Sequence, residues 1–132
     1  MEQAFDLCEA VGWDRAGIVL DSLHVARTGT SYDDITDLDG RELPLVQFTD
    51  GSAAPQPDVV TNSRHFRLLP GDGELALDRF VAAVRSTGFD GIVAAEVLSQ
   101  VLRHDDPTNV ATRIHDALRR YWTAEPALGV TP

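Results

Sequence analysis

The chain has 132 residues, which is the length of one domain with a single hydrophobic core. Its formal net charge of -10 argues against nucleic acid as a partner, because proteins that bind nucleic acids neutralise phosphates with basic side chains. All 11 basic residues are arginine, which excludes Schiff-base catalysis by a lysine.

The sequence contains neither a charged-then-apolar leader nor a run of about 18 apolar residues, so we expect neither secretion nor membrane insertion. Its single cysteine, Cys8, has no partner for an internal disulfide, which fits a reducing cytoplasm. Cys8 lies in an apolar helical pattern, so we interpret it as a packed thiol rather than a nucleophile.

Apolar periodicity, capping residues and glycine stops divide the chain into alternating helices and strands. Gly12, Gly40 and Gly88 end the first three predicted helices, and Pro107 suits the first turn of the last one. In chain order we predict a helix at 2–12, a strand at 16–20, a helix at 32–38, a strand at 43–48, a helix at 75–87, a strand at 91–97 and a helix from 107 to about 122.

Two segments lack such periodicity. Residues 51–73 are polar and rich in proline and glycine, which predicts a long loop, and loops of this length in a compact domain are usually functional or disordered. Residues 124–132 are expected to form a flexible tail, so the folded part is predicted to span 1–123.

The three strands are apolar throughout and are separated by helices, which is typical of a parallel sheet covered by helices. A doubly wound sheet and a (β/α)8 barrel both have this order of elements. The turn after the first strand, Asp21-Ser22-Leu23-His24, has no glycine for binding a dinucleotide. Polar residues instead recur at the carboxyl ends of the strands, which favours the barrel.

Asp21, Gln47 and Glu96 lie at or near the ends of the three strands, and parallel strands bring these ends to one face. Two carboxylates and an amide oxygen form a hard oxygen site that suits Mg²⁺ or Mn²⁺. The alternative is structural: Asp21 caps the following turn, Gln47 is a polar strand end, and Glu96 pairs with an arginine. The recurrence at all three strands favours a metal site.

Four further side chains are candidates for chemistry near these strand ends. His24 follows Asp21 by three residues and is suited to move a proton as a general acid or base. Arg67 is a candidate to bind a substrate carboxylate or phosphate, with Arg64 and His65 assisting. The alternative for Arg67 is an ion pair within its own loop, with Asp72 or Glu74.

These residues occur in an order that resembles the sugar phosphate isomerases and epimerases of the xylose-isomerase-like TIM-barrel superfamily. The resemblance covers about residues 4–122 and rests on Asp21-x-x-His24, Gln47-x-x-Asp50, Arg67-x-x-Pro70-Gly71-x-Gly73 and Glu96. It implies that Asp21 and Glu96 match the second and fourth metal ligands of the family, and that Gln47 replaces the usual histidine at the third.

Gln47, together with the string Ser63-Arg64-His65-Phe66-Arg67, resembles the 3-dehydroshikimate dehydratase branch. That branch implies a divalent metal, a catalytic histidine matching His24 and a substrate-binding arginine matching Arg67. Isomerase-like relatives share the loop string, so the resemblance leaves an isomerase or epimerase and a dehydratase open. In each case the substrate is a small polyol, sugar or cyclic hydroxy acid.

A complete (β/α)8 barrel needs about 250 residues, so the resemblance implies a partial TIM barrel made of the last three βα units. We therefore expect an apolar sheet edge and a bare barrel-interior face, and no activity from the chain alone. Completion would come from a missing N-terminal half or from a homo-oligomer. The alternative function is a non-catalytic module for oligomerisation or interaction, whereas an enzyme resembling endonuclease IV disagrees with the acidic charge.

Overall fold

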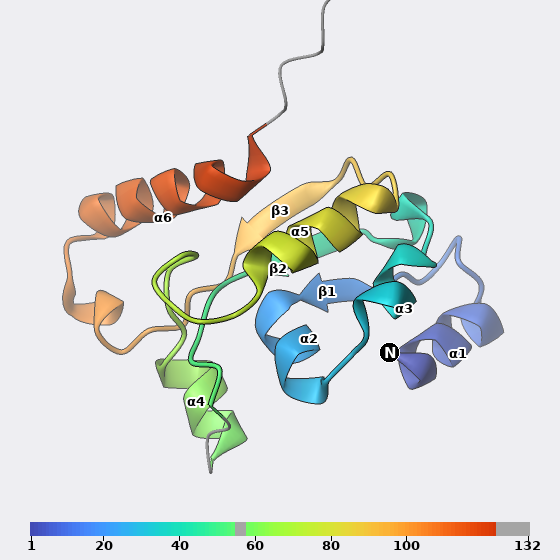
Figure 1. Cartoon of the computed structure of the whole chain (residues 1–132), viewed down its shortest axis with the longest axis horizontal. Helices are drawn as coiled ribbons and strands as arrows, with labels where there is room; N and C mark the ends of the chain where they lie inside the picture. Colours follow the sequence, from blue (N-terminus) through green and yellow to red (C-terminus); the bar gives the residue numbers. More distant parts are fainter. Residues whose placement is uncertain (55–57, 124–132) are drawn as a thin grey trace, which may run out of the picture.

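A computed structural model describes residues 1–54 and 58–123 (Figure 1), so the predicted tail at 124–132 lies outside the described residues. Strands β1 (Val19–Asp21), β2 (Leu45–Phe48) and β3 (Ile92–Ala95) form one parallel sheet in the order β1-β2-β3. The predicted parallel sheet is therefore confirmed, with each strand shorter than the sequence indicated. The helices are α1 (Glu2–Val11), α2 (Ser22–Thr28), α3 (Tyr32–Thr36), α4 (Val59–His65), α5 (Leu77–Ser86) and α6 (Pro107–Trp122), with 3-10 turns η1 (Gly40–Glu42) and η2 (Leu102–His104).

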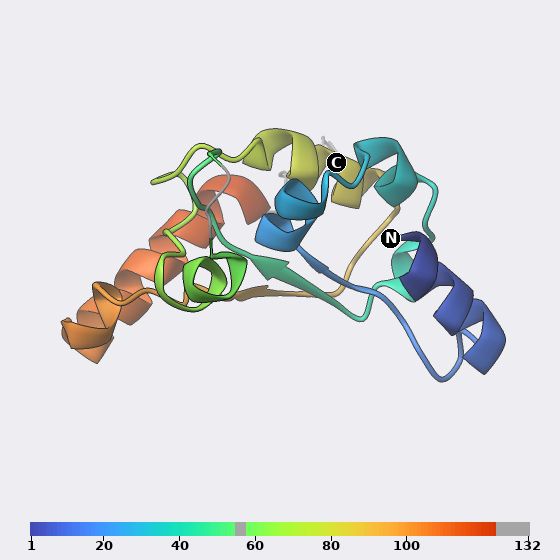
Figure 2. The ribbon, with the colours of Figure 1, turned by 90° about the horizontal axis from the view of Figure 1, so that it is seen from below.

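One face of the sheet carries the hydrophobic core. Leu20, Val46 and Phe48 are at most 2% exposed and belong to this core. Helices α2, α3 and α5 lie on one side of the sheet (Figure 2). Phe48 stacks on Phe80 of α5 and contacts two aromatic rings at the end of α6. The apolar faces of α5 and α6 therefore pack against this face of the sheet.

Cys8 of α1 belongs to the same core, where it is 4% exposed, so the interpretation as a packed thiol agrees with the structure. None of the helices in residues 1–54 and 58–123 is long and apolar enough to cross a membrane.

The opposite face of the sheet is bare in the part of the chain that the structure describes. Alternate residues of a strand point to opposite faces, and Val19, Leu45 and Ile92 share a register position on this side. Val19 is 49% and Ile92 69% exposed. Figure 2 shows the sheet nearly edge-on with this side open, as expected for three units of a barrel whose interior is normally filled by side chains.

The sequence interpretation missed helix α2. It placed a turn after the first strand, but Asp21 accepts hydrogen bonds from the backbone N–H groups of Leu23 and His24 and so caps a helix that begins at once. Leu23 and Val25 of this short helix are buried.

The prediction of a continuous loop at 51–73 is also wrong, because it contains helix α4. Asp58 caps α4 by accepting a hydrogen bond from the N–H of Thr61 at 3.0 Å. The sequence of α4 mixes exposed valines with polar residues, and a helix without an apolar stripe gives no periodic signal. Helix α4 lies beyond the carboxyl end of the sheet (Figure 1).

Candidate functional site

Asp21, Gln47 and Glu96 meet at the carboxyl edge of the sheet. Asp21 is in register with Gln47 on the neighbouring strand, and Gln47 is in register with Ala94. Glu96 follows Ala94 by two residues and therefore points to the same face. Its N–H donates to the Phe48 carbonyl at 3.3 Å, which continues the pairing one step past β3.

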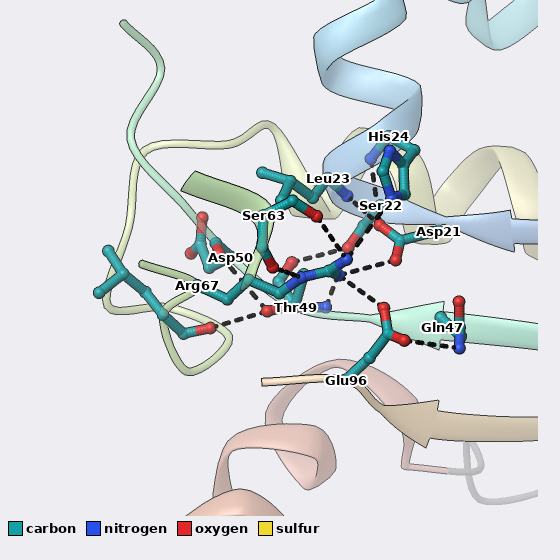
Figure 3. A network of polar contacts seen from close by, with 11 residues as sticks. Asp21, Ser22, Leu23, His24, Gln47, Thr49, Asp50, Ser63, Arg67 and Glu96 are labelled. Carbon is teal, nitrogen blue, oxygen red and sulfur yellow. Dashed lines mark hydrogen bonds and ion pairs between the residues drawn. The ribbon is translucent and has the colours of Figure 1, made fainter. Parts of the chain in front are cut away.

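The guanidinium of Arg67 lies between the two carboxylates (Figure 3). Its Nη1 is 2.7 Å from Asp21 Oδ2 and 2.9 Å from Glu96 Oε2, and the arginine side chain is 2% exposed. Arg67 thus pairs with the strand ends rather than with Asp72 or Glu74 of its own loop. A single nitrogen that bridges two carboxylates marks a point where this fold binds positive charge.

The other guanidinium nitrogens of Arg67 bind the loop side of the site. Nε donates to the Ser63 carbonyl at 2.8 Å and Nη2 to the Ser63 hydroxyl at 3.1 Å. Nη2 also lies 3.5 Å from His24 Nε2, which is the outer limit of a hydrogen bond. Because Ser63 is in α4, this helix determines where the guanidinium lies.

Gln47 completes the cluster by donating from Nε2 to Glu96 Oε1 at 3.1 Å. The structural alternative considered for the strand ends is thus also realised: Asp21 caps α2, and Glu96 pairs with an arginine. These contacts leave the predicted ligands grouped around one point, with Gln47 beside Glu96 (Figure 3).

The two carboxyl groups differ in acidity. Burial by itself would raise the pKa of Asp21, but hydrogen bonds with Arg67, Glu96 and the backbone N–H of His24 lower that pKa below its ordinary value. Burial raises the pKa of Glu96, and the neighbouring Asp21 raises it further against the opposing charge of Arg67. Asp21 is therefore the more firmly ionised member of the pair.

Asp50 holds the loop that carries Arg67, a role that the sequence interpretation missed. Its buried carboxylate accepts hydrogen bonds from the N–H groups of Gly51, Gly71, Gly73 and Leu75, at 2.8 to 3.1 Å. A Cβ on Gly73 would collide with the Asp50 carboxylate. The only signal for Asp50 in the sequence was its position three residues after Gln47. That position did not reveal which backbone N–H groups the carboxylate binds.

The remaining predicted residues lie around the cluster rather than in it. His24 is exposed in the first turn of α2. Arg64 is exposed and His65 half-buried at the end of α4, where the His65 ring contacts Phe66. Within residues 1–54 and 58–123, neither Arg64 nor His65 makes a polar side-chain contact with Asp21, Gln47 or Glu96. Their predicted role in substrate binding stays a prediction.

The donor set can be compared with the needs of a divalent cation. The described residues contain no group of three or more His, Cys, Asp and Glu side chains that could hold a metal. The strand ends offer two carboxylates and one amide instead, and these hard oxygens suit Mg²⁺, Mn²⁺ or a similar ion. The residues present fit such a cation in kind and in grouping, since both carboxylates already converge on a positively charged atom.

Comparison with known proteins places this arrangement in a family. The model of the xylose isomerase-like TIM barrel family matches residues 1–121. A 3-dehydroshikimate dehydratase of Pseudomonas aeruginosa is 35% identical over 102 residues, which are 77% of this chain and 16% of the dehydratase. An inosose isomerase of Bacillus velezensis is 30% identical over 96 residues, which are 73% of this chain and 33% of the isomerase.

A solved structure of the IOLI protein with a zinc atom superimposes with a TM-score of 0.82 at 23% identity, covering 94% of this chain and 45% of that one. The chain thus spans less than half the length of each of these three relatives. The parallel three-stranded sheet and its helices correspond to part of a barrel. With the family model matching nearly all of the described residues, the chain belongs to the xylose isomerase-like TIM barrel family.

Proposed function

We propose that residues 1–123 are the C-terminal part of a divalent-metal-dependent enzyme that removes a proton next to a metal-polarised carbonyl. Asp21, Gln47 and Glu96 would hold the metal. The observation that carries the proposal is the convergence of the Asp21 and Glu96 carboxylates on one cation-binding point, 2.7 and 2.9 Å from the same nitrogen.

The bound metal would polarise a carbonyl or hydroxyl oxygen of the substrate. The chain's own residues would transfer the proton and bind the substrate. His24 lies beside the cluster on an exposed helix turn, where its imidazole can take a proton from the substrate and return it. Mg²⁺ or Mn²⁺ is proposed from the oxygen donors; the zinc atom of the IOLI structure is a property of that protein.

Arg67 would bind an anionic group of the substrate, with Arg64 and His65 assisting from the end of α4. Two carboxylates, a divalent cation and one guanidinium leave the loaded site with a positive charge, which favours an anion. This charge favours elimination of water from a cyclic hydroxy acid, as by a dehydratase, over isomerisation of a neutral polyol. The Pseudomonas aeruginosa relative, at 35% identity, is a 3-dehydroshikimate dehydratase.

A chimaera tests the reaction. The 102 residues of this chain that match the dehydratase would replace their counterparts in the Pseudomonas aeruginosa protein, and the 96 that match the isomerase would enter the Bacillus velezensis protein. We expect the first chimaera to dehydrate 3-dehydroshikimate with Mn²⁺, and Asp21→Asn in it to abolish turnover. Asp72→Asn, an exposed carboxylate of the loop, is the matched control. Activity in the isomerase chimaera alone would assign the chain to the isomerases.

Calorimetry tests the metal directly. We expect Mn²⁺ to bind the 132-residue chain, and both Asp21→Asn and Glu96→Gln to weaken binding by at least about tenfold, which is about 1.4 kcal/mol. Glu9→Gln removes an exposed carboxylate of α1 and should leave the affinity unchanged. Equal affinities in all four proteins would contradict the assignment of the ligands.

The second candidate is a non-catalytic module that joins other chains, and the exposed apolar sheet face favours it. A well-folded dimer or larger assembly that binds no divalent metal would support this module over the enzyme. For either function we propose a cytoplasmic protein that binds neither nucleic acid nor membrane, based on the net charge of -10 and the lone buried cysteine.

A further inference from the structure

Arg67 has a set of observed partners, the two carboxylates, and one proposed partner, the substrate, and it cannot bind both at the same time. Its Nη1 is bound by Asp21 and Glu96, the proposed metal ligands, yet its proposed task is to bind the substrate. We propose that Arg67 is the counter-ion of the metal-free site, and that a divalent cation displaces its guanidinium toward the substrate. This inference rests on the metal site proposed above.

Geometry excludes joint occupation of the site as it stands. The carboxylate oxygens of Asp21 and Glu96 lie 2.7 and 2.9 Å from Nη1, and Mg²⁺ or Mn²⁺ bound to both would need oxygens at about 2.0–2.2 Å. The ion would therefore lie between the same two oxygens that hold Nη1. A divalent cation and a guanidinium held by the same two oxygens repel each other, so the guanidinium has to leave when the metal binds.

The contacts of Arg67 separate into two groups that would behave differently. Those with Asp21 and Glu96 belong to the strand ends and would be lost. Those with the carbonyl and hydroxyl of Ser63 come from α4, four residues earlier in the same loop, and do not involve the carboxylates that a metal would take. Nη2 already lies next to His24, on the exposed side of the cluster (Figure 3). Rotation of the side chain toward His24 would thus carry Nη1 away from the carboxylates to the exposed side, with the Ser63 contacts adjusting to the new orientation of the planar guanidinium.

Such a displacement couples metal and substrate. In the structure the guanidinium of Arg67 is paired with the carboxylates and its side chain is 2% exposed, so its charge is hidden from an anion. Once the metal takes the carboxylates, the guanidinium needs a new partner. Metal binding would then strengthen anion binding, and by thermodynamic reciprocity the anion would strengthen metal binding by the same factor.

Chemical labelling of the unmodified 132-residue chain tests the displacement. Phenylglyoxal reacts with accessible guanidinium groups, and mass spectrometry measures the labelling of each arginine. We expect Arg67 to be protected without metal and its labelling to rise severalfold with saturating Mn²⁺. Arg41 and Arg103, which are exposed, should react equally in both states and serve as internal references.

Metal affinity provides the second measurement. Arg67→Gln removes the competing cation, so we expect it to bind Mn²⁺ at least about tenfold more tightly than the wild type. Arg103→Gln removes the same charge from an exposed turn and controls for the general electrostatic effect. Circular dichroism without metal shows whether each variant is folded. The labelling experiment uses only the wild-type chain, so it does not depend on the folding of any variant.

The outcomes separate the two proposals. Mn²⁺ binding with unchanged Arg67 labelling, or an Arg67→Gln affinity equal to that of Arg103→Gln, would overturn the displacement and leave the metal site in place. A wild-type chain and an Arg67→Gln variant that both bind no Mn²⁺ would overturn the metal site and the displacement together. Mn²⁺ binding by Arg67→Gln alone would keep the metal site but overturn the displacement, because the ion would then be unable to move Arg67.

Discussion

At the residue scale, the chain depends on two buried carboxylates with different tasks. Asp50 accepts hydrogen bonds from four backbone N–H groups and thereby shapes the turn that follows Arg67. Asp21 caps α2 with one oxygen and binds Arg67 with the other. Each carboxylate lies at a strand end, where the backbone still has open donors to satisfy.

We expect Asp50→Ala to lower the free energy of unfolding by about 3 kcal/mol or more, because it leaves several buried N–H groups without an acceptor. Asp72→Ala, at an exposed position in the same turn, should change it by less than about 0.5 kcal/mol. Urea denaturation of both variants measures the difference. Equal losses would mean that the turn is held by something other than the Asp50 carboxylate.

The lowered pKa of Asp21 predicts a defined pH dependence. A carboxyl group whose pKa is lower in the folded chain than its ordinary value of 3.8 stabilises the fold above that pH. The contribution is lost as the pH falls through the pKa of Asp21 in the folded chain, because protonation of the Asp21 carboxylate breaks its ion pair with Arg67. At pH 6 we expect Asp21→Asn to cost about 1.5–3 kcal/mol, the range for hydrogen bonds to charged groups.

Between pH 4 and pH 2, the wild type should lose more stability than Asp21→Asn, because the variant lacks the group that titrates. Asp14→Asn, at an exposed position, is the control for one lost negative charge. Parallel acid-unfolding curves for the wild type and Asp21→Asn would show that the Asp21 ion pair does not stabilise the fold.

At the element scale, Phe48 links the sheet to two helices. Its ring is fully buried, stacks on Phe80 at 6.0 Å and meets Tyr121 and Trp122 edge-on at 5.3 Å. Helix α6 buries only Ala117 completely, so these aromatic contacts hold much of its C-terminal half against the sheet.

Phe48→Ala should therefore cost about 3–5 kcal/mol, the range for truncating a buried aromatic side chain, and should loosen α6 beyond the rest of the fold. Hydrogen exchange would show this as lost protection of α6 amides relative to those of α5. Phe66→Ala removes a ring that is 53% exposed and is the matched control. Unchanged protection of α6 would show that other contacts hold this helix.

At the scale of the whole molecule, the sheet is covered on one face and bare on the other in the described residues. Val46 and Ile92 represent the two faces: Val46 is fully buried under the helices, and Ile92 is 69% exposed. Apolar surface left open in this way promotes association.

We expect Ile92→Lys to leave the free energy of unfolding within about 0.5 kcal/mol of the wild type, as for other exposed sites, and to reduce self-association in sedimentation velocity. Val46→Lys should unfold the chain, because it buries an unpaired charge. If Ile92→Lys also unfolds the chain, this face of the sheet is not bare, and a segment or partner outside the described residues covers it.

Much of the fold was predictable because it depends on local patterns. Continuous apolar runs between helices predicted three parallel strands, and glycine stops and caps predicted most helix ends. Helix α2 was missed because its start depends on one aspartate that looked like a strand end, and α4 because it has no apolar stripe. The grouping of Asp21, Gln47 and Glu96 was predictable, since parallel strands in neighbouring positions align their ends.

The amino-acid sequence by itself determined the parallel sheet, the acidic strand ends and the family resemblance, because each is encoded in residues close together in the chain. Only the tertiary structure decided where Arg67 points. Its partners are Asp21, 46 residues away, and Glu96, just past β3, and the choice between them and its loop neighbours depends on α4. Position along the chain carries no information about such a contact, because it forms only when the strand ends and the loop come together.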